Sequence, residues 1–304
     1  MPQGRVTVIG SFNQDIVLRL PRMPVAGETL AAEAMDRFPG GKGSNQAIAA
    51  ARAGATVTLL ACLGADAAGE DAQALWRAEG VAARVSLNLT LPTGTAVILL
   101  EPDGRNRILL APGANAALPP TVPGEGAEVV LAQLEVPTAS IVAAFAASDA
   151  IRVLNAAPAD LCAARILLPL TDILLVNEGE ATALAAALAP GAGTQPADLA
   201  RALATRVGLA AIVTAGDRGA FLARPQGRSA HAPALRVTVC DTTGAGDAFA
   251  GALVAAIAAG TTFEEALRRG TCAGSLACTM LGAVPSLPHA AAIAAALASQ
   301  GHPA

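Results

Sequence analysis

The sequence is poor in aromatic residues and carries little charge. Its 304 residues include six Phe, one Trp and no Tyr, which are too few rings to build a surface on which nucleobases stack. The formal net charge of −4 argues against a nucleic-acid-binding protein, because such proteins need clustered basic side chains. No apolar run reaches the roughly 20 residues that span a bilayer, and a strand-like segment at Arg5–Gly10 stands where a signal peptide would begin. We therefore expect a cytoplasmic protein with neither nucleic-acid nor membrane partners.

Paired cysteines and clustered histidines are also missing. The five cysteines show no paired spacing and have apolar neighbours, and the three histidines lie far apart. Cysteines of this kind are typical of buried free thiols in a reducing compartment. The histidines predict neither a metal cluster nor a triad with a nucleophile. The cysteines in question are Cys62, Cys162, Cys240, Cys272 and Cys278.

Lysine occurs once, at Lys42, against nineteen arginines. This lysine lies in the run Gly40-Gly-Lys-Gly-Ser-Asn-Gln, directly before a segment of helical character. Glycines there would let the backbone approach a ligand, although a glycine-rich turn before a helix can also be purely structural. The run is not a Walker A loop, because the spacing of that motif is missing.

Short β-branched runs alternate along the chain with longer alanine-rich segments of helical character. This alternation predicts an α/β fold in which helices cover both faces of a doubly wound, mostly parallel sheet. Ligands bind such sheets beyond the carboxyl ends of the strands. We expect strands at Val6–Ile9, Thr56–Cys62, Val129–Gln133, Ile151–Asn155, Ile173–Val176 and Ala211–Thr214. We expect helices at Ser44–Ala53, Ala67–Glu79, Thr138–Ala147, Glu178–Leu188, Pro196–Thr205, Ala245–Ala258, Phe263–Cys278 and His289–Ser299.

Two stretches interrupt this alternation. Asp15–Phe38 predicts extended segments joined by prolines and a glycine, and Thr93–Leu110 predicts a hairpin that turns at Pro102-Asp-Gly-Arg. Each stretch is too short to be stable alone. We expect them to pair into one small sheet, a lid over the mouth of the main domain that would exclude water during a transfer reaction.

The most informative motif is Asp241-Thr-Thr-Gly-Ala-Gly-Asp, which leads into an apolar helix. Gly244, Ala245 and Gly246 would expose several backbone N–H groups together at a helix N-terminus, which favours binding of an anion. Asp247 would stand beside that anion as a base able to take a proton from an attacking hydroxyl. An anion site next to a base predicts phosphoryl transfer.

Asn13 and Asp15 follow the first predicted strand, where an open α/β sheet places ligand contacts. An amide and a carboxylate there would bracket vicinal hydroxyl groups of a sugar. Considered separately, the same two residues are equally explained as turn caps.

Taken together, these segments resemble the PfkB carbohydrate kinases, and among them the ribokinase group. The resemblance covers nearly the whole chain and implies a single ribokinase-like domain over residues 1–304, with lid segments at about 13–40 and 93–112. Eight motifs carry it in order: Gly10-Ser-Phe-Asn-Gln-Asp, Gly40-Gly-Lys-Gly-Ser-Asn-Gln-Ala, Pro112-Gly-Ala-Asn-Ala-Ala-Leu, Gln133-Leu-Glu-Val-Pro, Asn155-Ala-Ala-Pro-Ala, Asn177-Glu-Gly-Glu, Thr214-Ala-Gly-Asp-Arg-Gly and Asp241-Thr-Thr-Gly-Ala-Gly-Asp.

The resemblance implies a role for each matching residue. Asp247 would be the general base, and the N–H groups of Gly244, Ala245 and Gly246 would form the anion hole. The sugar would be held by Asn13, Asp15, Gly41, Lys42, Asn45 and Glu135, next to Asp247. ATP and Mg²⁺ would be held by Asn177, Glu180, Thr214, Gly216, Gly219, Gly246 and Thr271. A monovalent cation, usually K⁺ in this group, would bind Asp241, Thr243, Ala277, Met280, Gly282 and Ser286, mostly through backbone carbonyls.

The resemblance therefore implies ATP-dependent phosphorylation of the primary hydroxyl of D-ribose to D-ribose 5-phosphate, in a homodimer formed through the lid. An exposed apolar edge at Val97–Leu100 would agree with that dimer. A different free sugar, a nucleoside or a phosphosugar stays open as substrate, since Gln14 between the sugar ligands is larger than expected and Arg105 and Arg107 flank the lid turn. A non-catalytic sugar-binding regulator is the alternative from another class.

Overall fold

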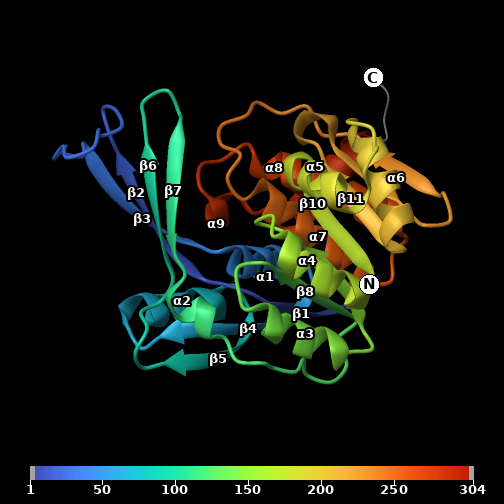
Figure 1. Ribbon diagram of the computed structural model, residues 1–304, viewed down its shortest axis with the longest axis horizontal. Coiled ribbons are helices and arrows are strands. Elements are labelled where there is room, and N and C mark those ends of the chain that lie inside the picture. Colours follow the sequence, from blue (N-terminus) through green and yellow to red (C-terminus); the bar gives the residue numbers. More distant parts are fainter. Residues whose placement is uncertain (1–3, 301–304) are drawn as a thin grey trace.

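The structure of the protein, a computed structural model, describes residues 4–300. Within that range a nine-stranded sheet forms the centre of the molecule (Figure 1). Seven neighbouring strands of this sheet run parallel to one another, and the last two strands at one edge pair in antiparallel fashion. In spatial order they are β13 (Ser229–Ala232), β12 (Ala220–Ala223), β11 (Ala210–Thr214), β10 (Ile173–Asn177), β9 (Ile151–Asn155), β8 (Val129–Gln133), β1 (Arg5–Ile9), β4 (Thr56–Gly64) and β5 (Ala82–Asn88).

Helices cover both faces of this sheet, as the strand patterns require. Val6 and Val8 of β1 belong to the apolar cluster on one face, whereas Ile9 belongs to the cluster on the other, because neighbouring residues of a strand point to opposite faces. The first face is covered by α1 (Lys42–Arg52), α2 (Ala67–Ala78), α7 (Ala245–Ala258), α8 (Phe263–Ala277) and α10 (Ala290–Gln300). The second is covered by α3 (Thr138–Ala146), α4 (Leu161–Leu167), α5 (Glu178–Leu188) and α6 (Pro196–Val207). Short helical turns complete the chain at α9 (Ala283–Ser286), η1 (Gly113–Ala117), η2 (Leu168–Leu170) and η3 (Gly216–Arg218).

The predicted α/β sheet is confirmed, and every predicted strand and helix is present with bounds that differ by a few residues at most. Three strands and two helices escaped prediction. Strand β5 is largely exposed at the sheet edge and lacks a continuous apolar run. Strands β12 and β13 have only four residues each, too few to show a pattern. Helices α4 and α9 are too short to show a helical repeat of apolar residues.

The two irregular stretches pair into one four-stranded sheet, as predicted, and this small sheet projects from the body of the molecule (Figure 1). Its order is β3 (Ala34–Gly40), β2 (Asn13–Arg19), β6 (Thr95–Leu100) and β7 (Asn106–Ala111). The expected apolar edge at Val97–Leu100 is wrong, because the parallel pairing of β2 with β6 places β6 inside the sheet. The apolar edge is instead β7, all of whose residues are exposed.

The expectation of buried thiols holds for only part of the cysteines. All five are free, but only Cys62 and Cys272 are buried, while Cys162 and Cys240 are exposed. Cys162 lies in the first turn of α4, which sequence analysis missed, and Cys240 lies in the irregular segment before α7. The apolar residues next to these two cysteines in the sequence therefore did not predict that their side chains are exposed.

The start of α1 lies against the carboxyl end of β1, and two glycines make that approach possible. A Cβ atom on Gly43 would lie 2.5 Å from both Cα and the carbonyl carbon of Gly10. Two side chains in that space would push the helix away from the sheet. The contact places the first turn of α1 directly above the carboxyl edge of the sheet.

Gly43→Ala should therefore lower the free energy of unfolding by about 2–3 kcal/mol, the usual cost of forcing a methyl group into packed backbone. Denaturation in urea measures this. Gly179→Ala is the matched control, since a Cβ at that helical glycine would meet only Asn177 Oδ1, at 3.4 Å, and alanine favours a helix by up to about 1 kcal/mol. Equal stability of the Gly43 variant and the wild type would contradict the role given to this contact.

Candidate active site

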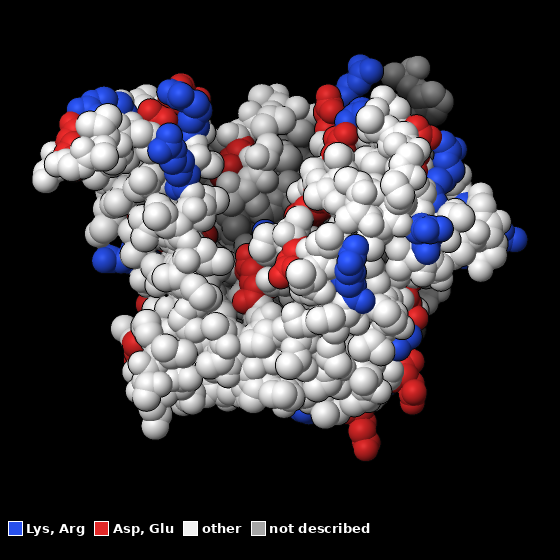
Figure 2. Space-filling model, viewed as in Figure 1, with Lys and Arg blue, Asp and Glu red and all other residues white. Residues whose placement is uncertain are grey.

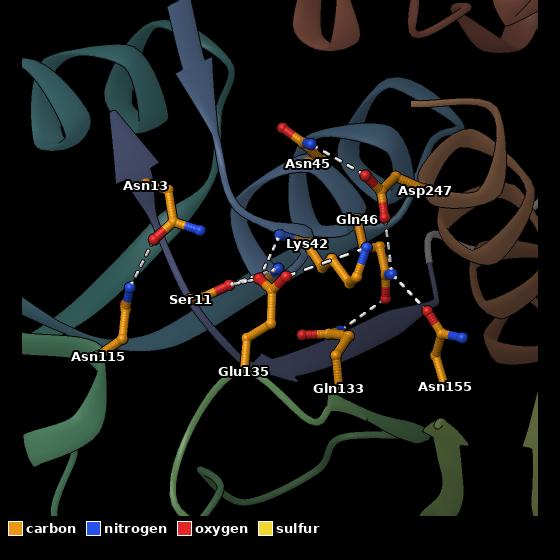
Figure 3. A network of polar contacts seen from close by, with 11 residues as sticks. Ser11, Asn13, Lys42, Asn45, Gln46, Asn115, Gln133, Glu135, Asn155 and Asp247 are labelled. Atoms are coloured by element: carbon orange, nitrogen blue, oxygen red, sulfur yellow. Dashed lines mark hydrogen bonds and ion pairs between the residues drawn. The ribbon is translucent and has the colours of Figure 1, made fainter. Parts of the chain in front are cut away.

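A cleft opens between the small sheet and the main body, and acidic side chains line its walls (Figure 2). The carboxyl ends of the parallel strands and the N-termini of α1 and α7 meet at its floor (Figures 1 and 3). This is the place where open parallel sheets bind ligands. Five of the predicted site residues come close enough here to act on one another's charge, from segments far apart in the chain: Asp15, Lys42, Glu135, Glu180 and Asp247.

Asp247 lies in the first turn of α7, at the floor of the cleft. Gly244 precedes the helix in the left-handed region, at φ 79°, which lets the chain turn sharply into α7. Asp247 Oδ2 accepts a hydrogen bond from Asn45 Nδ2, and Oδ1 accepts one from Gln46 Nε2, both at 2.9 Å (Figure 3). Burial raises the pKa of Asp247, while the charge of Lys42 and the two amide hydrogen bonds act to lower it. The carboxylate thus depends on these neighbours to stay ionised.

Glu135, which follows β8, is held by the start of α1. Its Oε2 accepts hydrogen bonds from Ser11 Oγ at 2.5 Å and from the backbone N–H of Lys42 at 3.0 Å. Its Oε1 lies 4.0 Å from Lys42 Nζ. The first turn of α1 and this carboxylate therefore fix each other's position.

Lys42 is the cation that the surrounding carboxylates share. Burial alone would lower the pKa of its ammonium group, but the nearby negative charges raise the pKa above its usual value. Lys42 thus stays charged within the site. The charges that act on it are Asp247, Glu135, Glu180 and Asp15.

Asn13 and Asp15 lie on β2 and form the wall of the cleft that belongs to the small sheet. Asn13 Oδ1 accepts a hydrogen bond from Asn115 Nδ2 at 2.9 Å, which fixes its amide orientation. Burial, with the charges of Glu135 and Asp247, raises the pKa of Asp15 to about 7, and Lys42 opposes this rise. A side chain on Gly40 would collide with the Asp15 carboxylate, so this glycine makes room for it.

The residues predicted for the nucleotide follow neighbouring strands. Asn177 ends β10 and caps α5: its Oδ1 accepts from the Glu180 N–H, and its own N–H donates to Glu180 Oε2, both at 2.9 Å. Thr214 ends β11, and Gly216 and Gly219 form the turn that follows. A side chain on Gly219 would collide with the carbonyl oxygen of Ala232 on β13. The Asn-x-x-Glu spacing therefore has a structural reason, the capping of α5.

Asp241 joins the loop before α7 to the loop before α9. Its Oδ1 accepts from Thr243 N–H at 2.9 Å and Thr243 Oγ1 at 2.7 Å, and its Oδ2 accepts from Gly282 N–H at 2.9 Å. These hydrogen bonds lower the pKa of Asp241 against the effect of burial. Within residues 4–300 no group of three or more His, Cys, Asp or Glu side chains is arranged to hold a metal. A cation here would be held largely by carbonyl oxygens, which suits a weakly hydrated monovalent ion better than a divalent one.

The carboxylate of Asp247 in the first turn of α7 therefore lies among amides and carboxylates that come from α1, β2 and the end of β8. Residues 3–290 match the model of the pfkB family carbohydrate kinases. The chain belongs to this family.

Several relatives of this pfkB carbohydrate kinase are ribokinases. The ribokinase of Haemophilus influenzae is 35% identical over 294 residues, which are 93% of this chain and 95% of the relative. The crystal structure of ribokinase from Thermotoga maritima has a TM-score of 0.86 at 31% identity and covers 97% of this chain and 99% of that one. Arabidopsis thaliana ribokinase complexed with ribose and ATP has a TM-score of 0.83 at 31% identity, with coverage of 97% and 99%.

The remaining predicted residues of this kinase belong to α8 and to the segment that follows it. Thr271 is buried in α8, where its hydroxyl donates to the Leu267 carbonyl at 2.9 Å. Ser286 is buried too, and its hydroxyl donates to the Ala283 carbonyl at 2.8 Å. Ala277 is buried at the end of α8, and Met280 is half exposed beyond it. The roles assigned to these residues stay predictions.

Sequence analysis missed the buried polar residues behind the site. Gln46 donates to Asp247, Gln133 donates to Gln46, and Asn115 holds Asn13. All belong to motifs that carried the resemblance, but their side-chain partners lie far away in the sequence. A polar residue inside an otherwise apolar strand or helix was the signal available for Gln133 and Gln46.

The raised pKa of Asp15 predicts a pH dependence of stability. Between about pH 4 and 7 the folded state holds a proton on Asp15 that the unfolded state has released, so the free energy of unfolding falls as the pH rises. The Asp15→Asn variant should lack this slope. From pH 5 to pH 8 its free energy of unfolding should rise by about 1–2 kcal/mol relative to that of the wild type, which is less than the full linkage value because solvent reaches the side chain. Urea denaturation of both proteins at several pH values checks this. Parallel curves of unfolding free energy against pH for the two proteins would contradict this prediction.

Proposed function

We propose that this kinase transfers the γ-phosphoryl group of ATP to the primary hydroxyl of D-ribose and forms D-ribose 5-phosphate. The observation that carries the proposal is the Asp247 carboxylate in the first turn of α7, next to the N–H groups of Gly244 and Gly246 and facing the amides of the cleft. The Ala245 N–H between them donates to the Thr242 carbonyl at 3.2 Å. The similarity to ribokinases, including one solved with ribose and ATP, supports it.

Asp247 takes the proton of the hydroxyl as its oxygen attacks the γ-phosphorus. The new O–P bond forms while the bond from the phosphorus to the leaving oxygen of ADP breaks. Backbone N–H groups at the start of α7, with the partial positive charge of the helix end, stabilise the negative charge on the transferred group. Binding of the sugar falls to Asn13, Asp15, Gly41, Lys42, Asn45 and Glu135.

Two observations favour a free sugar over the open alternatives. Three arginines of the small-sheet segments are paired with nearby carboxylates: Arg19 with Asp36, Arg22 with Glu28 and Arg105 with Glu101 and Asp103. They are thus poorly suited to hold the second phosphate of a phosphosugar.

An aromatic sandwich for a nucleoside is also poorly supported. Phe12 is buried and packs edge-on against Trp76 at 5.8 Å between ring centroids. Phe38 lies opposite Asp15 in the pairing of β2 with β3. Gln14 lines a depression with Phe12 and residues of α2 and alternates with Asn13 and Asp15 along β2, so it faces away from them. The large side chain of Gln14 therefore leaves the sugar side free.

We further propose the cofactors and the organisation that the resemblance implies. Mg²⁺ would accompany ATP near Asn177 and Glu180, and K⁺ would bind around Asp241, where it would stabilise the loops that flank the anion site. The whole chain would act as one kinase domain in the cytoplasm, with the small sheet, formed by segments within 13–40 and 93–112, as its lid.

A coupled assay of ADP release with purified protein tests this function. We expect K⁺-stimulated turnover with ribose, and little with fructose 6-phosphate or adenosine. Asp247→Asn should lower kcat by about 10²–10⁴-fold, the usual contribution of a general base, while ATP still binds in calorimetry. Glu70→Gln, which changes an exposed carboxylate in the first turn of α2, is the control. Absence of turnover on every acceptor would overturn the function, and wild-type kcat in Asp247→Asn would remove the base.

Dimerisation through the small sheet gives a separate prediction. Ile108, Leu109 and Leu110 of β7 are 62%, 58% and 47% exposed at the sheet edge, where a second copy would cover them. Leu110→Glu together with Ile108→Glu should convert a dimer into a monomer in sedimentation experiments at micromolar concentration. Leu89→Glu, at an apolar residue 84% exposed elsewhere, should leave the dimer intact. A wild-type protein that sediments as a monomer would contradict this proposal.

A further inference from the structure

A chain of buried side-chain amides connects the centre of the sheet to the Asp247 carboxylate (Figure 3). Gln133 Nε2 on β8 donates to Gln46 Oε1 on α1 at 2.6 Å. Gln46 Nε2 in turn donates at 2.9 Å to two acceptors, Asn155 Oδ1 and Asp247 Oδ1. Gln46 and Gln133 have no exposed surface. The Gln46 amide is therefore bound at its oxygen and at both hydrogens of its nitrogen.

The orientation of this amide is fixed by its partners. Asn155 Nδ2 donates to the Leu175 carbonyl at 3.1 Å, so Asn155 presents its oxygen to Gln46. A reversed Gln46 amide would place an oxygen against that oxygen and against the Asp247 carboxylate. Gln46 thus holds Asp247 Oδ1 with a donor that cannot turn away without losing its other two hydrogen bonds.

The other carboxylate oxygen has a different environment. Asp247 Oδ2 accepts from Asn45 Nδ2, whose own Oδ1 is buried and has no hydrogen-bond partner within residues 4–300. The Asn45 amide is thus incompletely bonded, and a hydroxyl group of a sugar would satisfy its oxygen. Rearrangement of Asn45 toward that hydroxyl would free Oδ2 and leave Oδ1 anchored.

We infer that Gln46 is a positioning residue for phosphoryl transfer: it anchors Oδ1 of Asp247, so that Oδ2 is the oxygen that accepts the hydroxyl proton. This inference rests on the proposed role of Asp247 as the base. The proton passes from the hydroxyl to Oδ2, and the electron pair that it leaves on the hydroxyl oxygen forms the bond to phosphorus. Gln46 has no exposed surface, so we assign it no contact with sugar or nucleotide.

The hydrogen bond from Gln46 also acts on the charge of the base. The charged groups that face Asp247 are Lys42 on α1, which favours the ionised form, and two carboxylates that disfavour it: Glu135 throughout, and Asp15 only above about pH 7, where it loses its own proton. Burial works in the same direction as those two carboxylates. Removal of a donor to Oδ1 should therefore shift protonation of the base to higher pH.

Steady-state kinetics from pH 5 to 9 on Gln46→Leu and Gln46→Glu test the inference. In Gln46→Leu we expect kcat to fall about 10-fold or more with KM for ATP unchanged, and the acid limb of kcat to move up by about one pH unit, which corresponds to about 1.4 kcal/mol. In Gln46→Glu the limb should move further, because a second carboxylate beside Asp247 disfavours its ionisation. Gln46→Met, an unbranched side chain of similar length, replaces the leucine variant if that protein does not fold.

Ser44→Ala is the matched control on the same helix. Ser44 Oγ accepts from Trp76 Nε1 at 2.8 Å and is fully buried, so the substitution should lower the melting temperature and leave the pH profile unchanged. Identical acid limbs in the wild type and the position-46 variants would overturn the inference. Wild-type turnover of another acceptor instead of ribose would overturn only the proposed substrate, and the pH test would then be run on that acceptor.

The wild-type protein offers a measurement that needs no substitution. Its glutamine side-chain amides can be labelled with ¹⁵N and followed by NMR as the pH changes. One amide resonance that titrates with the midpoint of the acid limb of kcat is expected from Gln46. Absence of any such resonance would overturn the inference.

Discussion

The carboxylate of Asp247 must stay charged at a place where burial favours its protonation, and much of the site is arranged around that constraint. Lys42 supplies a positive charge, and two amides supply hydrogen bonds to the two carboxylate oxygens. All three of these groups belong to the first turns of α1. The position of this helix against the carboxyl end of β1 therefore decides whether Asp247 is ionised.

That position depends on the backbone contact between Gly10 and Gly43. Parallel strands bring their carboxyl ends to one edge of the sheet, so β1, β8 and β9 deliver Ser11, Glu135 and Asn155 to the same small volume. The parallel sheet thus concentrates polar groups at one end, while its apolar faces hold the helices that close around them. Stability and site geometry have the same structural origin here.

Local patterns predicted the elements and the residues that lie within one motif. Asp247 and the glycines before it, or Lys42 and Asn45, are adjacent in sequence and act from a single helix turn, so a short motif contains their relation. Gln46, Gln133 and Asn155 act through contacts between segments about a hundred residues apart, and no local pattern contains that relation. The order of strands in the small sheet could not be predicted for the same reason. The sequence of a hairpin does not show which of its two strands will pair with β2.

Electrostatics also explains why one lysine stands among so many arginines. Arg52 and Arg152 each place two guanidinium nitrogens against the two oxygens of a single carboxylate, Glu79 and Asp172, at 2.7–2.8 Å. A planar fork of this kind satisfies one partner from one side. The cleft requires a cation that acts on carboxylates arriving from several elements, with Glu135 at 4.0 Å and Asp247, Glu180 and Asp15 around it. A compact ammonium group on a flexible stem meets that requirement, since its charge acts equally in all directions. An arginine that held one of these carboxylates side-on, as Arg52 and Arg152 do, would place its charge less centrally among the four and leave Asp247 less well compensated.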